Sequence, residues 1–238
     1  MKILHVIPTL SEGGAELMLE RLIIHQLNRF EHVVVVFELE GEIERRLVQN
    51  RIKVHEIGLR KYLDLLGSFI RLAKIIRNEK PDVVQTWMYH ADLIGGLAAR
   101  FSGVSNILWS VRASEVRRGT GQSSGTIICR RLCALLSHFL PRLILYVAHS
   151  AKRRHISLGY SKKKVLVIPN GYDLDLYKLG PASGKSFRGT LEIPENAVLV
   201  GSIGSYNVYK NHIGFIQAAD ILRQRYENVY FLMAGRSP

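Results

Sequence analysis

Residues 2–29 read KILHVIPTLSEGGAELMLERLIIHQLNR. Residues 2–8 form an apolar run. Gly13-Gly14 separates this run from the apolar pattern that follows. From Ala15 to Arg29, apolar side chains recur every three or four positions, which is the spacing of one helix face. These side chains are Met18, Leu19, Leu22, Ile23 and Leu27. The stretch therefore predicts a strand, a glycine turn and a helix, the unit from which parallel α/β folds are built.

The same alternation continues to residue 168. The predicted strands are 2–8, 32–37, 53–57, 82–86, 107–111, 143–147 and 164–168, and the predicted helices are 15–29, 43–50, 62–78, 90–101, 124–139 and 151–158. Strands such as VVVV (33–36) are near-continuous apolar runs, as expected when helices cover both faces of a parallel sheet. We therefore expect an α/β fold with a doubly wound, Rossmann-like parallel sheet.

A second and shorter α/β pattern follows this sheet. A stretch rich in Gly, Pro and Ser predicts a linker at 179–190 between a first domain, 1–178, and a second, 191–238. The second pattern has predicted strands at 198–203 and 229–234 and a helix at 211–225. Two strands and one helix cannot bury both faces of a sheet, so we expect an incomplete Rossmann-like domain. Either the chain is a fragment, or this piece packs on the first domain or on another chain.

The composition excludes several classes of protein. A chain of 238 residues with 47% hydrophobic and 22% charged residues is not a disordered tail. The two cysteines, Cys129 and Cys133, lie four residues apart in a predicted helix and form neither a disulfide framework nor a zinc site. We find no signal peptide and no bilayer-spanning stretch. We expect a cytoplasmic protein, either soluble or peripheral on the inner face of the cell membrane.

Nearly all of the net charge of +13 lies in one segment. Residues 112–164 contain twelve Lys or Arg and one acid, Glu115, and carry +11. Clustered cations attract phosphates and anionic headgroups, so we expect an anionic membrane surface as a partner of this segment. A solvated face is the alternative for any single run, such as Lys162–Lys164. No zinc-finger, helix-turn-helix or RNA-binding signature accompanies the charge, so we expect no nucleic-acid partner.

The turn after the first predicted strand is one candidate phosphate site. At Gly13 and Gly14, backbone N–H groups and the positive end of the next helix suit a phosphate, although a tight connection is the alternative. By contrast, Asp173-Leu174-Asp175 has the D-x-D form of a metal site but lies in a predicted loop, and we expect no metal there.

Two later strand ends carry further candidates, because ligands bind at the carboxyl ends of strands in open α/β sheets. His90 titrates near neutrality and can take a hydroxyl proton or bind a substrate oxygen, while helix capping by His90 and Asp92 is the alternative. Arg112 ends the strand 107–111, where a guanidinium can hold a carboxylate or phosphate with two bonds.

The order of these pieces resembles the retaining GT-B glycosyltransferases of glycosyltransferase family 4. The resemblance rests on GGAE (13–16), HADLIGGLAAR (90–100), VLVIPNGYDLDLY (165–177), and VGSIGSYNVYKNHIGFIQAADIL (200–222) with FLMAG (231–235). It implies a first domain that binds the acceptor and a second that binds the nucleotide-sugar donor, with no cofactor and usually no metal. The residues implied are His90 and Arg112 as catalytic, Gly13, Gly14, Ser205 and Lys210 at the donor phosphates, and Glu16, Tyr89 and Asp92 at the acceptor.

The chain departs from the family pattern in three places. Ser205 stands where an arginine is common, Arg112 stands where many relatives have histidine, and the chain ends before the Glu-x7-Glu motif. We therefore expect a sugar transferase for a cell-surface polysaccharide or lipid-linked acceptor, in a C-terminally truncated form that is weak or inactive alone. The alternatives are a non-catalytic module that binds a membrane surface or a second chain, and a nucleotide-sugar epimerase.

Overall fold

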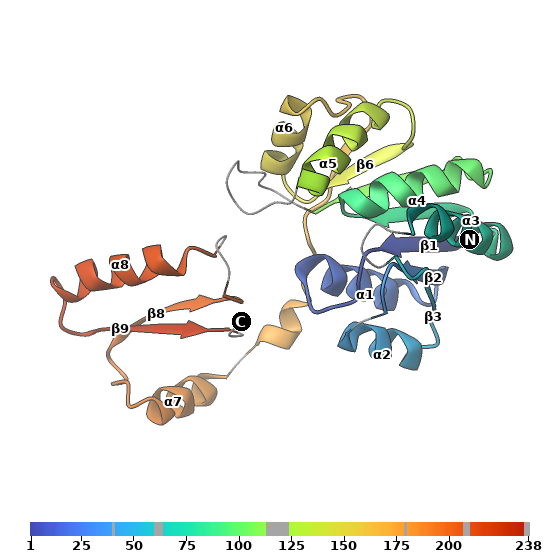
Figure 1. The fold of residues 1–238 in the computed structure, drawn as a ribbon. Coiled ribbons are helices and arrows are strands. Elements are labelled where there is room, and N and C mark those ends of the chain that lie inside the picture. The colour runs from blue at the N-terminus through green and yellow to red at the C-terminus, as the bar shows by residue number, and fades with distance from the viewer. Residues whose placement is uncertain (40, 60–63, 113–123, 179, 207–209, 236–238) are drawn as a thin grey trace. The chain divides into compact units, whose positions relative to one another are not determined.

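The structure, a computed structural model, describes residues 1–39, 41–59, 64–112, 124–178, 180–206 and 210–235. The chain divides into two compact units, residues 1–171 and 172–238 (Figure 1). The division falls seven residues before the domain boundary expected from the sequence. Each unit is described by itself.

The first unit is a seven-stranded, fully parallel sheet with the strand order β3-β2-β1-β4-β5-β6-β7. The strands are β1 Lys2–Ile7, β2 Glu31–Val36, β3 Lys53–Glu56, β4 Val83–Trp87, β5 Ile107–Val111, β6 Leu143–Tyr146 and β7 Val165–Val167. The helices are α1 Gly14–Gln26, α2 Glu42–Gln49, α3 Leu65–Glu79, α4 Tyr89–Phe101, α5 Ser124–Leu136 and α6 His149–Ser157. The doubly wound sheet predicted from the sequence is confirmed.

Both faces of this sheet are covered, because successive side chains of a strand point to opposite faces. Val34 and Val36 of β2 pack with the apolar side chains of α1 and α2, while Val33 and Val35 belong to a second core with α3, α4 and α5. The strand order reverses between β1 and β4. In such sheets, the carboxyl ends of the two strands at this point form the ligand crevice.

Helix α4 lies very close to the sheet because it has two consecutive glycines on its buried side. A Cβ atom added at Gly95 would lie 3.0 Å from Thr86 Cγ2 and 3.2 Å from Val6 Cβ. A Cβ atom at Gly96 would lie 2.9 Å from Trp109 Nε1. The helix backbone therefore packs directly against side chains of the strands, and this contact fixes the start of α4 at the carboxyl edge.

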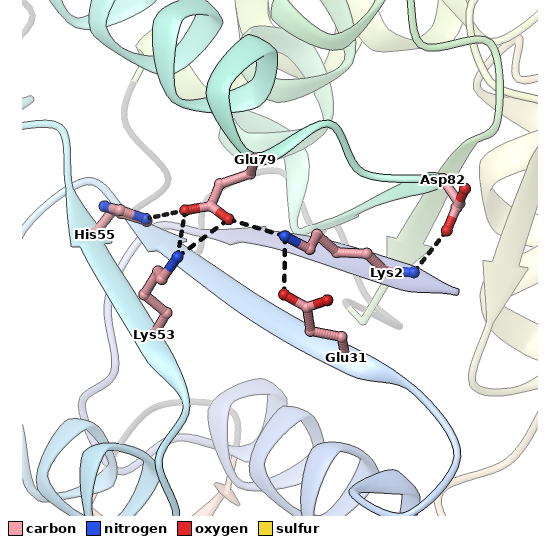
Figure 2. Close-up of polar contacts among 6 residues, drawn as sticks. All are labelled: Lys2, Glu31, Lys53, His55, Glu79 and Asp82. Carbon is pink, nitrogen blue, oxygen red and sulfur yellow. Dashed lines mark hydrogen bonds and ion pairs between the residues drawn. The ribbon is translucent and has the colours of Figure 1, made fainter.

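An ion cluster around Glu79 lies at the amino edge of the sheet (Figure 2). The Glu79 carboxylate accepts hydrogen bonds from Lys53 Nζ at 3.0 Å, His55 Nε2 at 3.1 Å and Lys2 Nζ at 3.2 Å. Burial opposes ionisation of Glu79, but the bonds from Lys53, His55 and Lys2 outweigh it and lower the pKa to about 2. The cluster joins α3 to β1 and β3, at the edge opposite the crevice.

We expect Glu79→Gln to lower the free energy of unfolding by about 2 kcal/mol at pH 7, because it leaves three basic groups without their shared carboxylate. The folded-state pKa lies below the ordinary 4.5, so this stabilisation is present above pH 4.5 and is lost as the pH falls toward 2. Urea unfolding at pH 7 and pH 3 measures both effects. Glu31→Gln, at an exposed partner of Lys2, is the control and should change stability by less than about 0.5 kcal/mol. Equal losses for the two variants would contradict this account.

The second unit contains a short 3-10 helix, Leu174–Tyr177, then α7 Pro181–Thr190, β8 Val198–Ile203, α8 His212–Arg223 and β9 Val229–Ala234. Strands β8 and β9 pair in parallel, as predicted. The prediction of a linker over 179–190 is wrong for residues 181–190, which form α7. Pro181 begins this helix, where the fixed φ of proline suits the first turn.

None of the helices in the described part of the chain has the length and apolar character needed to cross a membrane.

Candidate functional site

A pocket of about 460 Å³ opens at the carboxyl edge of the sheet in the first unit. Its walls come from the segments that follow β1, β4, β5, β6 and β7, on both sides of the point where the strand order reverses. The pocket brings together five residues predicted from the sequence: Gly14, Glu16, Tyr89, His90 and Arg112. The edge predicted for ligand binding therefore has a real cavity.

Arg112 is a largely enclosed cation in this pocket. Its Nη1 donates to Asn170 Oδ1 at 2.8 Å, and its guanidinium carbon lies 4.5 Å from the centre of the Trp87 ring. The Nε atom is buried and has no hydrogen-bond partner, and no carboxylate among the described residues forms an ion pair with Arg112. Burial lowers the pKa of Arg112 to about 10, so the side chain stays charged at neutral pH. This arrangement suits an anionic ligand.

The glycine turn at the start of α1 is occupied by the carboxyl group of Glu16. A Cβ atom at Gly13 would lie 2.3 Å from Glu16 Oε2, whereas one at Gly14 would meet nothing within 4 Å. Burial raises the pKa of Glu16, while the backbone N–H groups of Glu16 and Ala15 oppose that shift. The backbone N–H groups of this turn therefore already donate to the Glu16 carboxylate. An anion that binds at the turn would lie next to this negative charge.

His90 lies on the wall between two pockets. It lines the pocket with Arg112 and also a second one of about 420 Å³, whose other walls include Phe37, Leu59 and Ile94. Burial lowers the pKa of His90, so the imidazole is neutral near pH 7.

Met88, just before α4, has a φ of 71°, a conformation that costs a non-glycine residue energy and is found most often at functional sites.

Asp92 points away from the pocket into the interior, whereas Tyr89 lines the pocket and has its hydroxyl group paired with His155. Asp92 is fully buried, accepts a hydrogen bond from Thr86 Oγ1 at 2.5 Å, and does not line the pocket. Burial raises the pKa of Asp92 to about 8, against the effect of Thr86, so the group is neutral at pH 7. The Tyr89 hydroxyl pairs with His155 Nε2 at 2.6 Å. The structure thus places Asp92 in the interior, outside the residues that line the pocket.

Ser205 and Lys210 belong to the second unit, in the connection between β8 and α8. Lys210 is exposed, and its methylene groups pack against Gly204: a Cβ atom added at Gly204 would lie 3.2 Å from Lys210 Cε. The carbonyl of Ser205 accepts a hydrogen bond from His212 Nε2 at 3.2 Å. Both residues follow the carboxyl end of β8 and precede α8.

The D-x-D carboxylates of the second unit are engaged locally. Asp173 accepts a hydrogen bond from the backbone N–H of Asp175 at 3.0 Å, and the Asp175 carboxylate pairs with Lys178. Within the described ranges, no three His, Cys, Asp or Glu side chains are grouped to hold a metal ion.

The sequence assigned no role in the site to Asn170 or Trp87, the two residues that contact Arg112. Asn170 lies in the IPNG segment, which was noted only for its resemblance to a family. Trp87 ends β4 and is fully buried; its indole N–H lies 3.4 Å from His5 Nδ1. A strand-terminal aromatic residue beside a predicted strand-terminal arginine is a signal that could have found this pair.

Comparison with known proteins bears on this fold and site. CapH of Staphylococcus aureus, a capsular polysaccharide biosynthesis glycosyltransferase, is 25% identical, over 99% of this chain and 62% of CapH. A UDP-Gal:alpha-D-GlcNAc-diphosphoundecaprenol alpha-1,3-galactosyltransferase of Escherichia coli is 26% identical, over 65% of this chain and 40% of that protein. This chain therefore spans less than two thirds of the length of both relatives.

Solved structures share the fold. Anabaena Alr3699/HepE, crystallised with UDP-glucose, superposes with a TM-score of 0.78 at 21% identity, over 98% of this chain and 60% of that chain. At this identity the likeness shows the fold alone. The sequence model of Glycosyltransferase Family 4 matches residues 12–176, which is more than half of the chain and includes every residue that lines the pocket with Arg112. The chain belongs to glycosyltransferase family 4.

Proposed function

We propose that this chain belongs to a retaining glycosyltransferase that moves a hexose from a nucleotide-diphosphate sugar to a lipid-linked or polysaccharide acceptor at the cell surface. The observation that carries the proposal is Arg112, an enclosed cation at the ligand edge of the sheet with no carboxylate partner in the described residues. The E. coli relative acts on a sugar linked through diphosphate to a polyprenol, and a diphosphate is an anion that Arg112 can hold.

In this proposal, the acceptor lies in the pocket of the first unit. The acceptor hydroxyl oxygen forms a bond to the anomeric carbon of the donor sugar, while the bond from that carbon to the donor diphosphate breaks. The nucleoside diphosphate leaves with the electron pair, and a cation such as Lys210 of the second unit is the kind of group that stabilises its charge. His90 is neutral near pH 7 and in position at the pocket wall to accept the hydroxyl proton.

Two measurements test the proposal in parallel. The probe is N-acetylglucosamine linked by diphosphate to a short, water-soluble isoprenyl chain, hereafter the diphosphate acceptor. Calorimetry with residues 1–238 should show binding of the diphosphate acceptor, and mass spectrometry should detect the extended glycan after incubation with a panel of UDP-sugars. A chain that binds neither the diphosphate acceptor nor any UDP-sugar would refute the proposal.

Glu16 provides a prediction within this site. Glu16→Gln removes a negative charge from the pocket wall, so we expect the diphosphate acceptor to bind about three- to tenfold more tightly at pH 7.5. Because burial raises the pKa of Glu16, the affinity of the unmodified chain should rise as the pH falls toward 5.5, and the variant should lose this dependence. Glu42→Gln on exposed α2 is the control. Identical dissociation constants for all three proteins would show that Glu16 does not face the ligand.

A second candidate function is a module that binds an anionic surface, with or without catalysis. It is favoured by residues 124–171, which contain nine lysines and arginines and no aspartate or glutamate. Such a stretch attracts an anionic membrane at the inner face of the cell. Sedimentation with vesicles tests it: binding should require anionic lipid and weaken at 500 mM salt. Equal binding to neutral and anionic vesicles would contradict it, and co-purification of a second chain would favour a protein partner instead.

A further inference from the structure

The outer face of α5 carries a row of exposed apolar side chains, here named the α5 stripe: Ile128, Leu132, Leu135 and Phe139. Their spacing of four, three and four residues places them on one side of the helix and of the turn that follows it. The four residues are between 44% and 63% exposed. The other side of α5 packs inward through Cys129 and Cys133, whose thiols donate to the Tyr89 carbonyl at 3.3 and 3.4 Å.

Basic side chains adjoin the α5 stripe. Arg131 is exposed and lies one turn from both Ile128 and Leu135. The connection that carries Lys162–Lys164 is attached to the end of α5 by three hydrogen bonds. They join His138 Nε2 to the Gly159 carbonyl at 3.1 Å, Ser161 N to Ser137 Oγ at 2.8 Å, and Lys164 Nζ to the Pro141 carbonyl at 3.2 Å. The stripe is therefore flanked by cations along its side and at its end.

We infer that α5 lies flat in the surface of an anionic lipid bilayer, with the α5 stripe inserted below the headgroups and Arg131, Lys162 and Lys163 in contact with lipid phosphates. An apolar face flanked by cations is the arrangement found in interfacial helices. Each basic side chain near an anionic surface strengthens binding about fivefold. With 13 residues, α5 is too short to cross a bilayer. Its exposed apolar face is therefore suited to lying along the bilayer surface.

This placement sets the distance between the membrane and the pocket. Thr126 lines the pocket with Arg112 and lies on α5, turned about half a revolution from Ile128. A helix is about 10 Å across, so the pocket lies roughly one helix diameter from the headgroups. A diphosphate that rises by about one helix diameter from the headgroups therefore meets Arg112, while the rest of its lipid chain stays in the bilayer. This consequence rests on the proposed function, whereas the docking of α5 does not.

The docking is tested with residues 1–238 and vesicles of phosphatidylcholine with 30% phosphatidylglycerol. We expect Leu135→Ser with Phe139→Ser to weaken partition to these vesicles tenfold or more, because two inserted side chains are lost. The matched control is Leu66→Ser with Ile70→Ser on α3, which removes two similarly exposed apolar side chains and should leave partition unchanged. All four positions are exposed, so the variants should fold.

A fluorescence experiment measures insertion directly. Trp87 and Trp109 are fully buried, so Phe139→Trp adds a reporter at the surface. Lipids with brominated acyl chains should quench this reporter and should not quench Ile70→Trp. Equal partition of stripe and control variants, or an unquenched Phe139→Trp, would overturn the inference. The inference would also be overturned if the unmodified chain formed a dimer, the stripe variant were monomeric, and the stripe variant still bound vesicles. Loss of docking with intact binding of the diphosphate acceptor in solution would leave the transferase proposal standing.

Discussion

Arg112→Gln is expected to weaken binding of the diphosphate acceptor roughly 30- to 150-fold. The substitution removes a charge-assisted, two-bond contact worth about 2–3 kcal/mol. Arg112→Lys keeps the charge but loses the planar pair of donors, so it should recover only part of the affinity. Calorimetric titration of the three proteins under one salt condition measures the effect.

The same substitution should not destabilise the fold. Burial lowers the pKa of Arg112 to about 10, which means that the folded state disfavours the charged form below that pH. Replacing this cation with a neutral amide should therefore leave the free energy of unfolding unchanged or raise it. Arg77→Gln, at an exposed position on the opposite edge of the sheet, is the control for binding and should keep the affinity of the unmodified chain. If Arg112→Gln bound weakly and also lost much of its stability, Arg112 would have a structural role and not a direct role in binding.

Gly95→Leu is expected to lower the free energy of unfolding by about 3 kcal/mol or more. A Cβ atom at this position already comes within 3.0 Å of Thr86 and 3.2 Å of Val6, and three further carbon atoms have no space between α4 and the sheet. Chemical unfolding followed by circular dichroism measures the loss. Gly14→Ala on α1 is the matched control, because its Cβ meets nothing within 4 Å, and it should change stability by less than about 0.5 kcal/mol. A Gly95→Leu protein as stable as this control would contradict the seating of α4 on β1 and β4.

The seven-stranded sheet could be predicted because its strands are buried on both faces. Val33–Val36 shows this directly, since alternate residues enter two different cores and all four must be apolar. The carboxyl edge followed from the same pattern, because every strand of a parallel sheet ends on one side. Gly14, His90 and Arg112 were therefore expected at a common edge, and the structure brings them to one pocket.

Features that depend on side-chain direction could not be predicted in this way. Asp92 follows the same strand as His90, but two residues along a helix correspond to a turn of about 200°, so Asp92 points into the core. The bond between Arg112 and Asn170 joins residues 58 positions apart, and no local pattern shows it. Helix α5 is apolar on more than one side, so the sequence alone does not say that the α5 stripe is the exposed side.

Helix α7 shows a different limit. Its sequence, PASGKSFRGT, contains two glycines and a proline, which are typical of a loop. Proline is nevertheless well suited to the first turn of a helix, and Arg188 closes the other end by donating to the carbonyls of Pro194 and Ala197 at 3.2 and 2.9 Å. These bonds join the helix to residues beyond its end, and a prediction based on composition does not reveal them.

The central claim is that the carboxyl edge of the first unit binds the substrate, and hydrogen exchange with the diphosphate acceptor tests it most directly. The first N–H groups of a helix have no partner within the helix, so ligand contact should slow their exchange. We predict slower exchange at residues 13–16 and 88–92, at the starts of α1 and α4, and no change around the opposite pocket at residues 76–82 and 102–106. Slower exchange confined to residues 76–82 and 102–106, or unchanged exchange at both edges under saturating ligand, would contradict the account.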